Sequence, residues 1–300
     1  MTKDYVALGT FDGVHVGHRF LIGKLIQDAS LDGARSIVCI FDPHPLSVIS
    51  GKSAPKLLTS LKSRMEIISG LGAGEVRILD FNDTMVHVDG INFLRRLSEQ
   101  FNLGGLYVGF NFTFGDRGAW NKSDIARYAH DNQLKYFIAK SQKINGRPVS
   151  STLIRSFLDE GMVDKAFKYL GRPHMVEGIV AEGKRIGNSI GFPTANIPVD
   201  DRFAYPATGV YLTKVQYRGI WYDAMTNIGN NPTIADGNPR TVETHIIDMD
   251  KNIYGEYIKI AFFDRIRGEI KFKNVDMLRA QLSMDMVNAR KMHDKIDIYK

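Results

Sequence analysis

Cysteine is almost absent from this chain, since Cys39 is the only one among 300 residues. A single cysteine excludes an intrachain disulfide, disfavours a cysteine-based metal site and suits a reducing compartment. No apolar run approaches the ~20 residues that are needed to span a bilayer, and the first residues lack the apolar segment of a secretory signal. We therefore expect a cytoplasmic protein with no membrane attachment.

Net charge is also small for this length. The chain has 39 Lys+Arg against 33 Asp+Glu, a formal charge of +6 with histidine neutral, and the excess is spread along the sequence. This distribution favours ordinary solubility over a nucleic-acid surface, so we expect no nucleic-acid partner. Hydrophobic residues make up 44% and charged residues 24%, which is typical of folded domains. The length favours two domains, and we expect a monomer or a weak homo-oligomer.

The first half alternates short apolar runs with longer segments of helical spacing. Such alternation is typical of βαβ units, so it predicts an α/β domain with a parallel, Rossmann-like sheet. The expected strands are residues 5–8, 36–41, 76–81, 106–110 and 135–139, and the expected helices are 19–29, 61–70, 91–101 and 122–132.

The second half reads differently. Helical spacing from Ser151 onward ends at Gly171-Arg172-Pro173, a typical boundary signal. Beyond it, strand-like runs are separated by turn residues, which predicts an all-β domain, an antiparallel β-barrel closed by one helix at 275–293. We place the domain boundary between residues 168 and 169. The expected strands are 176–181, 210–217, 220–228, 242–247 and 257–263.

A glycine- and histidine-containing turn, residues 9–18 with the sequence G-T-F-D-G-V-H-V-G-H, follows the first predicted strand. In a parallel sheet this position is the edge where ligands usually bind. His15 and His18 are three residues apart, so a first helical turn aims both rings the same way, beside glycines that let a phosphate approach. The pattern predicts a phosphate-binding turn for nucleotidyl transfer. A metal cluster of these histidines with Asp12 and His44 is a less favoured alternative.

This turn resembles the HxGH signature of nucleotidyltransferases, and its longer form resembles the bacterial bifunctional riboflavin kinase/FAD synthetase family. Three later segments resemble motifs of that family in the same order: F-D-P-H-P at 41–45, V-G-F-N-F-T-F-G at 108–115 and S-S-T-L-I-R at 150–155. The resemblance implies that His15, His18 and Arg155 are catalytic. It further implies ATP or phosphate contacts from Gly9, Phe11, Asn111, Ser151 and Thr152. The chain departs from the family at Trp120, where glycine is common.

The second half carries three further motifs. A glycine-rich basic loop, with Gly183, Lys184 and Gly191, could fold over a polyphosphate. It leads into P-T-A-N at 193–196, which resembles a riboflavin kinase motif. Thr194 and Asn196 are two residues apart on an extended segment, so both could offer neutral oxygens to Mg²⁺. In V-E-T-H-I at 242–246, strand alternation separates Glu243 from its apolar neighbours, and the resemblance implies that it is the kinase base. His245 could orient Glu243 or be only a solvated strand residue, and we favour the second interpretation.

The resemblance covers essentially the whole chain and implies a bifunctional transferase of FAD biosynthesis. Residues 169–300 would phosphorylate riboflavin to FMN, and residues 1–168 would adenylylate FMN to FAD with release of pyrophosphate. ATP would be the co-substrate and Mg²⁺ the cofactor of both steps, with riboflavin, FMN and FAD as the other partners. Two alternatives stay open, an enzyme that keeps one activity and a flavin-binding regulator without turnover. The presence of a base, a metal pair and two histidines favours the enzyme.

Overall fold

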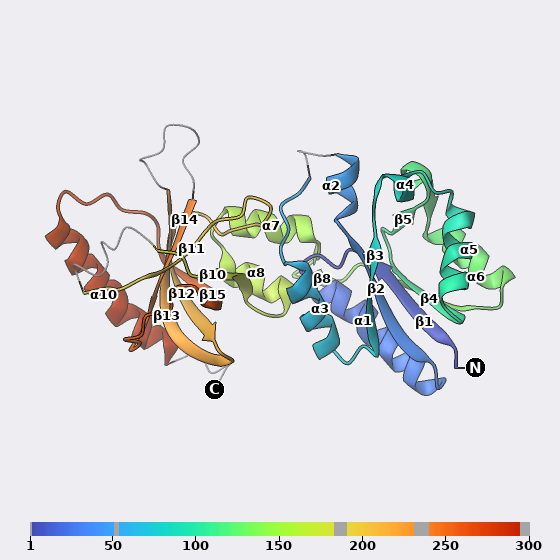
Figure 1. Cartoon of the computed structure of the whole chain (residues 1–300), viewed down its shortest axis with the longest axis horizontal. Coiled ribbons are helices and arrows are strands. Elements are labelled where there is room, and N and C mark those ends of the chain that lie inside the picture. Colours follow the sequence, from blue (N-terminus) through green and yellow to red (C-terminus); the bar gives the residue numbers. More distant parts are fainter. Residues whose placement is uncertain (1, 51–53, 183–190, 231–239, 295–300) are drawn as a thin grey trace. The chain divides into compact units, whose positions relative to one another are not determined.

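The computed structural model describes residues 2–50, 54–182, 191–230 and 240–294 (Figure 1). The chain divides into two compact units, Met1–Ser151 and Thr152–Lys300. This division falls before the predicted functional boundary at 168/169, because helices α7 (Ser151–Asp159) and α8 (Val163–Leu170) pack mostly within the second unit. The functional boundary itself stays a prediction. None of the helices within the described residues is long and apolar enough to cross a membrane.

The first unit is built on a five-stranded parallel sheet in the order β3-β2-β1-β4-β7, which confirms the predicted α/β fold. Helices α1 and α3 cover one face of the sheet and α5 and α6 cover the other (Figure 1). The strands are β1 (Asp4–Gly9), β2 (Arg35–Asp42), β3 (Glu75–Asp80), β4 (Leu103–Gly109) and β7 (Lys135–Ala139). The covering helices are α1 (Val16–Leu31), α3 (Leu61–Gly70), α5 (Gly90–Gln100) and α6 (Lys122–Asp131).

Every predicted strand and helix of this unit forms, with ends shifted by a few residues. The apolar positions explain why, since α1 buries Leu21, Ile22 and Leu25 while α5 buries Phe93, Leu94 and Leu97 at helical spacing. Several short elements lie outside the prediction because they are too brief to show a period. They are α2 (Pro45–Ile49), α4 (Asp83–Val86), η2 (Asp116–Gly118), β5 (Thr113–Phe114), β6 (Trp120–Asn121), β8 (Lys143–Ile144) and β9 (Arg147–Pro148).

The strand order reverses at β1. From β1 the chain proceeds outward through β2 and β3, and then it crosses back to place β4 and β7 on the other side. In open parallel sheets such a switch point opens a crevice at the carboxyl ends of the two central strands, and ligands bind there. Here the switch point lies between the segment after Gly9 and the segment after Gly109.

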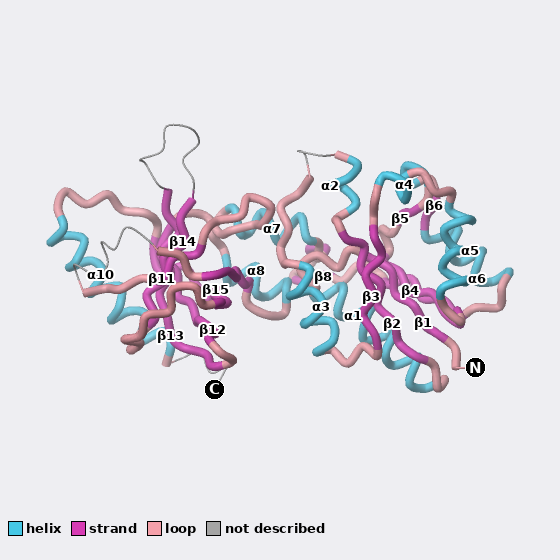
Figure 2. The backbone as a smooth tube through the Cα atoms, viewed as in Figure 1, coloured by secondary structure: helices cyan, strands magenta, loops and turns pink. Residues whose placement is uncertain are grey.

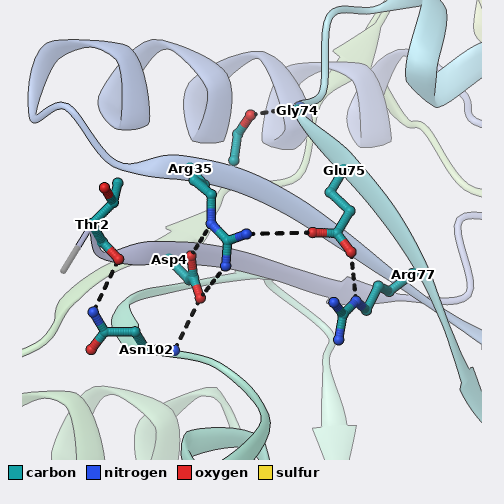
Figure 3. A network of polar contacts seen from close by, with 8 residues as sticks. Thr2, Asp4, Arg35, Gly74, Glu75, Arg77 and Asn102 are labelled. Atoms are coloured by element: carbon teal, nitrogen blue, oxygen red, sulfur yellow. Dashed lines mark hydrogen bonds and ion pairs between the residues drawn. The ribbon is translucent and has the colours of Figure 1, made fainter.

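The amino ends of the strands are held by a polar network (Figure 3). Asp4, only 1% exposed, accepts two hydrogen bonds from the Arg35 guanidinium, at 2.7 and 2.9 Å. It also accepts one from the backbone N–H of Asn102, at 3.0 Å. Arg35 reaches Glu75 at 4.0 Å, and Glu75 accepts a hydrogen bond from Arg77. The network links β1, β2, β3 and the turn before β4 at the edge away from the switch point.

The second unit contains a curled antiparallel sheet of six strands in the order β10-β15-β12-β13-β14-β11 (Figure 2). A bridge between Ala181 and Asn196, with the Ala181 N–H donating to the Asn196 carbonyl at 2.8 Å, links the segment after β10 to the edge strand β11. This curled sheet with its terminal helix confirms the predicted all-β domain. Strand β11 was not predicted, because it has only three residues. The strands are β10 (His174–Ile179), β11 (Ala195–Ile197), β12 (Gly209–Tyr217), β13 (Ile220–Asn230), β14 (Arg240–Ile246) and β15 (Tyr257–Arg267).

Helices cover one face of this sheet. Helix α10 (Val275–His293), at the predicted bounds, packs on β12, β13 and β15, while α8 packs on β15 through Phe167 and Phe263. Gly171 ends α8 in the left-handed conformation, at φ 69°, which only glycine adopts without cost. The opposite face carries a ladder of buried hydroxyls, in which Thr226 bonds Thr213 at 2.8 Å and Thr244 at 2.9 Å.

Candidate active sites

In the turn after β1, two residues other than glycine have a positive φ, a backbone conformation that is strained for them. Phe11 has φ 50° and Val14 has φ 38°, although β-branched residues rarely adopt positive φ. The Phe11 side chain is 1% exposed and lies against Gly9, where an added Cβ would come within 3.1 Å of its ring. Two predicted site residues, Gly9 and Phe11, therefore shape the turn from within, with the Phe11 ring buried against Gly9.

The two histidines stack on each other. Their ring centroids are 3.6 Å apart with a 12° angle between the planes, as the three-residue spacing predicts. His15 caps α1, since its Nδ1 accepts a hydrogen bond from the backbone N–H of His18 at 3.2 Å. Nδ1 of neutral His15 is thus an acceptor, which leaves its proton on Nε2 as a donor.

Both imidazoles are neutral at physiological pH. Burial lowers the pKa of His15 to about 4. Burial, with the adjacent charge of His15 as a smaller cause, holds the pKa of His18 well below its usual value. The Nδ1 of His18 is buried and has no hydrogen-bond partner among the described residues, which makes a charge on that ring more costly.

The other predicted residues of the first site come from separate segments. Asn111 is exposed just after β4, on the far side of the switch point from His15. The Ser151 hydroxyl donates to the Asp12 carbonyl at 2.9 Å and so ties the start of α7 to the histidine turn. Thr152 is exposed and Arg155 half-buried on α7, in the second compact unit.

The alternative metal cluster is not formed. Asp12 is 1% exposed and its Oδ1 accepts the backbone N–H groups of Leu58 and Thr59, while His44 uses its Nδ1 to cap α2. Within the described ranges there is no group of three or more His, Cys, Asp or Glu side chains placed to hold a metal.

Trp120, which stands where the sequence comparison expects a small residue, is accommodated by the packing around it. Its indole lies where a Cβ on Gly90 would come within 2.2 Å and one on Gly115 within 2.8 Å. It also packs near the Phe114 ring, at 5.8 Å between centroids. Two glycines therefore make room for the larger side chain.

In the second unit, strand register brings three predicted residues together. Asn196 on β11 pairs directly with Glu243 on β14. Paired residues in an antiparallel sheet share a face, with Cβ atoms about 5 Å apart. The side-chain amide nitrogen of Asn196 donates to the Thr194 carbonyl at 3.4 Å, so the Oδ1 atom of Asn196 takes no part in that hydrogen bond. Gly191 begins this segment with φ 84°, whereas Gly183 and Lys184 lie outside the described residues.

His245 is half-exposed on β14, in keeping with the prediction of a solvated strand residue, and it also contacts the P-T-A-N segment. Its Nδ1 donates to the Pro193 carbonyl at 2.8 Å, and its ring lies edge-on to Phe192 at 5.4 Å. His245 therefore fastens the P-T-A-N segment to β14. These contacts join segments that are distant in the chain, so strand alternation alone does not show them.

A cavity of about 360 Å³ adjoins this segment. It is lined by Thr194 and Thr244 together with the loop Met249–Tyr254. Glu243 does not line it, because it projects from the opposite face of β14 to Thr244.

Asn227 and Arg64 are candidate functional residues that the sequence prediction missed. Asn227 on β13 pairs with Glu243 from the side opposite Asn196, so three polar side chains form one row across β11, β14 and β13. No alternation of polar residues in β13 could have revealed it, because Thr226 and Asn227 are consecutive. Arg64, fully buried on α3, contacts the turn after β1 and the last residue of β2, and no local pattern signals a buried arginine.

Comparison with known proteins agrees with both halves. Residues 1–153 match the family model described as FAD synthetase, and residues 170–293 match the one described as riboflavin kinase. A solved structure described as a macrolide-efflux protein from Streptococcus pneumoniae superposes with a TM-score of 0.86 at 30% identity, over 97% of this chain and 95% of that one.

Curated relatives extend over almost the full length. The bifunctional riboflavin kinase/FMN adenylyltransferase of Listeria monocytogenes is 33% identical over 97% of this chain and 93% of its own. Those of Bacillus subtilis and Escherichia coli are 34% and 31% identical, over 96% and 95% of this chain and 92% and 91% of theirs. The chain therefore belongs to the bifunctional riboflavin kinase/FMN adenylyltransferase family, with the FAD synthetase part first and the riboflavin kinase part second.

Proposed function

We propose that this chain carries out both reactions of its family with the residues placed above. The first unit joins the adenylyl group of ATP to FMN at the switch point, and the second phosphorylates riboflavin at the Asn196–Glu243 row. The observation that carries the proposal is the pair of stacked, neutral histidines at the carboxyl end of β1. Riboflavin, FMN, FAD and ATP are the partners of these reactions, and their dependence on ATP supports the predicted cytoplasmic location.

In adenylyl transfer, an oxygen of the FMN phosphate attacks the α-phosphorus of ATP. A new P–O bond forms as the bond to the bridging oxygen breaks, and pyrophosphate leaves with that electron pair. Negative charge grows on the α-phosphate oxygens, and the Nε2–H of His15 is a preorganised donor for them. Because the imidazoles are neutral, they stabilise this charge by hydrogen bonding and need not give up a proton. Asn111, Gly9 and the Phe11 backbone line the same edge, and Ser151, Thr152 and Arg155 are proposed to hold the pyrophosphate.

In riboflavin phosphorylation, the primary hydroxyl oxygen of riboflavin attacks the γ-phosphorus, and ADP leaves. Glu243 accepts the hydroxyl proton, so the carboxylate becomes neutral as the new P–O bond forms. We place the phosphates of ATP at the Asn196–Glu243 row, beside the P-T-A-N segment. The glycine-rich loop, with Gly183, Lys184 and Gly191, is proposed to cover the phosphates.

The donor set beside Glu243 fits Mg²⁺. Thr194 offers a hydroxyl and Asn196 an amide oxygen that is not used by the hydrogen bond to the Thr194 carbonyl. Neutral oxygens supplemented by water and substrate phosphates are the usual magnesium environment. Bound there, Mg²⁺ would neutralise charge on the ATP phosphates.

One experiment tests the proposal as a whole. The purified chain is incubated with riboflavin, ATP and Mg²⁺, and the flavins are separated by chromatography. Accumulation of FAD through FMN is the expected result. FMN alone would show that only the kinase is active, and unchanged riboflavin would favour the regulator.

A further inference from the structure

Arg64 places a positive charge inside the first unit. Its side chain is 0% exposed, and a buried charge is costly unless it is paired and hydrogen-bonded. Nη2 donates to Oδ1 of Asp42 at 2.7 Å, and Nη1 donates to the carbonyl of Thr10 at 2.8 Å. Nε is buried without a partner among the described residues. The guanidinium therefore joins α3 to the last residue of β2 and to the turn that leads to the histidines.

The segment just before α3 holds the other half of the same turn. Backbone N–H groups of Leu58 and Thr59 donate to Oδ1 of Asp12, at 2.9 and 3.3 Å. The Thr59 hydroxyl accepts the backbone N–H of Gly13 at 3.0 Å. Residues 58–64, which we call the brace, thus contact Thr10, Asp12 and Gly13 in succession.

These contacts alternate with the strained positions. Phe11 lies between the contacts to Thr10 and Asp12, and Val14 directly follows the contact to Gly13. Left-handed conformations of such residues are unfavourable and persist only where the surroundings fix them. The residue after Val14 is His15, so the conformation of the turn sets where the stacked imidazoles begin.

We propose that Arg64 is a positioning residue for adenylyl transfer, which holds the strained turn so that His15 and His18 face the reacting phosphate. Arg64 itself does not touch substrate, since it is fully buried. Asp42 neutralises the guanidinium and ties the F-D-P-H-P segment to the same brace. This inference rests on the proposed role of the two histidines.

The test uses the full chain supplied with FMN, ATP and Mg²⁺. In Arg64→Met, which keeps the bulk but removes the charge and both donors, we expect kcat for FAD formation to fall on the order of 10²-fold, because small misplacement of catalytic groups has such effects. The KM for ATP should change far less, since much of the nucleotide is bound by other residues. Arg64→Lys can restore one of the two contacts and should recover part of kcat.

Two controls accompany these variants. Riboflavin phosphorylation by the same chain belongs to the second unit and should remain at the wild-type rate, which shows that this unit is folded. A cooperative urea unfolding transition followed by Trp120 fluorescence in a Trp221→Phe background shows that the first unit is folded. Arg95→Met is the matched substitution, because Arg95 is an exposed arginine on α5 whose side chain donates to Asn92 in its own helix turn, at 2.8 Å. It should leave both activities unchanged.

The outcomes separate the inference from the proposed function. An Arg64→Met protein with lower thermal stability but unchanged kcat would overturn the inference, since Arg64 would then only stabilise the fold. If this variant loses both activities, Asp42→Asn decides: a selective loss of FAD formation of about tenfold supports the inference, and an unchanged rate overturns it. The His15→Ala/His18→Ala variant is assayed in parallel. Full FAD formation by that variant would refute the proposed function itself.

Discussion

Acidification should destabilise the first unit through the buried imidazole of His15. The pKa of His15 is lowered to about 4 in the folded chain, against about 6.5 when unfolded. The unfolded chain therefore takes up the proton first as the pH falls. The contribution of neutral His15 to stability is fully present above pH 6.5 and is lost progressively as the pH falls toward and through 4.

The size of this effect follows from the two pKa values. Between pH 7.5 and 4.5, a group whose pKa changes from about 6.5 to about 4 on folding lowers the free energy of unfolding by about 2.5 kcal/mol. In His15→Gln, which retains a polar side chain without a titrating group, this part of the pH dependence should vanish.

The two tryptophans make the measurement possible. Trp120 lies in the first unit and Trp221 in the second, so in a Trp221→Phe background fluorescence reports the first unit alone. Urea unfolding at pH 7.5 and 4.5 would then be compared with and without His15→Gln. Equal pH dependence in the two proteins, or an NMR titration of His15 with a midpoint near 6.5, would refute the assignment of a neutral, buried imidazole.

Three further predictions concern activity. His15→Ala/His18→Ala should lower FAD formation by on the order of 10²-fold or more while FMN accumulates, because donors to the α-phosphate are lost; chromatography of the products checks this, and undiminished FAD would move the chemistry elsewhere. Glu243→Gln should lower FMN formation by roughly 10² to 10⁴ with the low end favoured, yet convert supplied FMN normally; loss of both activities would indicate misfolding instead. A fragment that begins at Thr152 should make FMN but no FAD. It should also melt at a higher temperature than a fragment that begins at Tyr169, because it keeps all of α8 and the contact between Phe167 and Phe263. Equal melting temperatures would contradict this.

Periodicity in the sequence was sufficient for the elements and the fold class of both units. Long segments such as 61–70 and 275–293 formed at the predicted bounds, because burial of one apolar face is repeated over several turns and dominates local preferences. The short strand β11 and the helix α2 escaped prediction, since a few residues carry no period.

Those features of the candidate sites that depend on residues close together in the sequence were predictable. The spacing of His15 and His18 indicated that their rings face the same way, and in the structure they stack. The sequence could not show that burial keeps both rings neutral, because desolvation depends on neighbours that are distant in the chain. For the same reason it did not show that His245, half-exposed on β14, is bonded to the Pro193 carbonyl just before β11.

Pairings between distant segments were decided only by the tertiary structure. Strand register sets Asn227 and Asn196 on either side of Glu243, and the packing of α3 brings Arg64 to Thr10 and Asp42. The sequence by itself determined which segments become helices and strands and which motifs end up at the sheet edge, because these follow from short-range period and turn chemistry. Which polar groups are buried, paired and aligned was determined by long-range packing, where the free energy of a charge or hydrogen bond depends on what surrounds it.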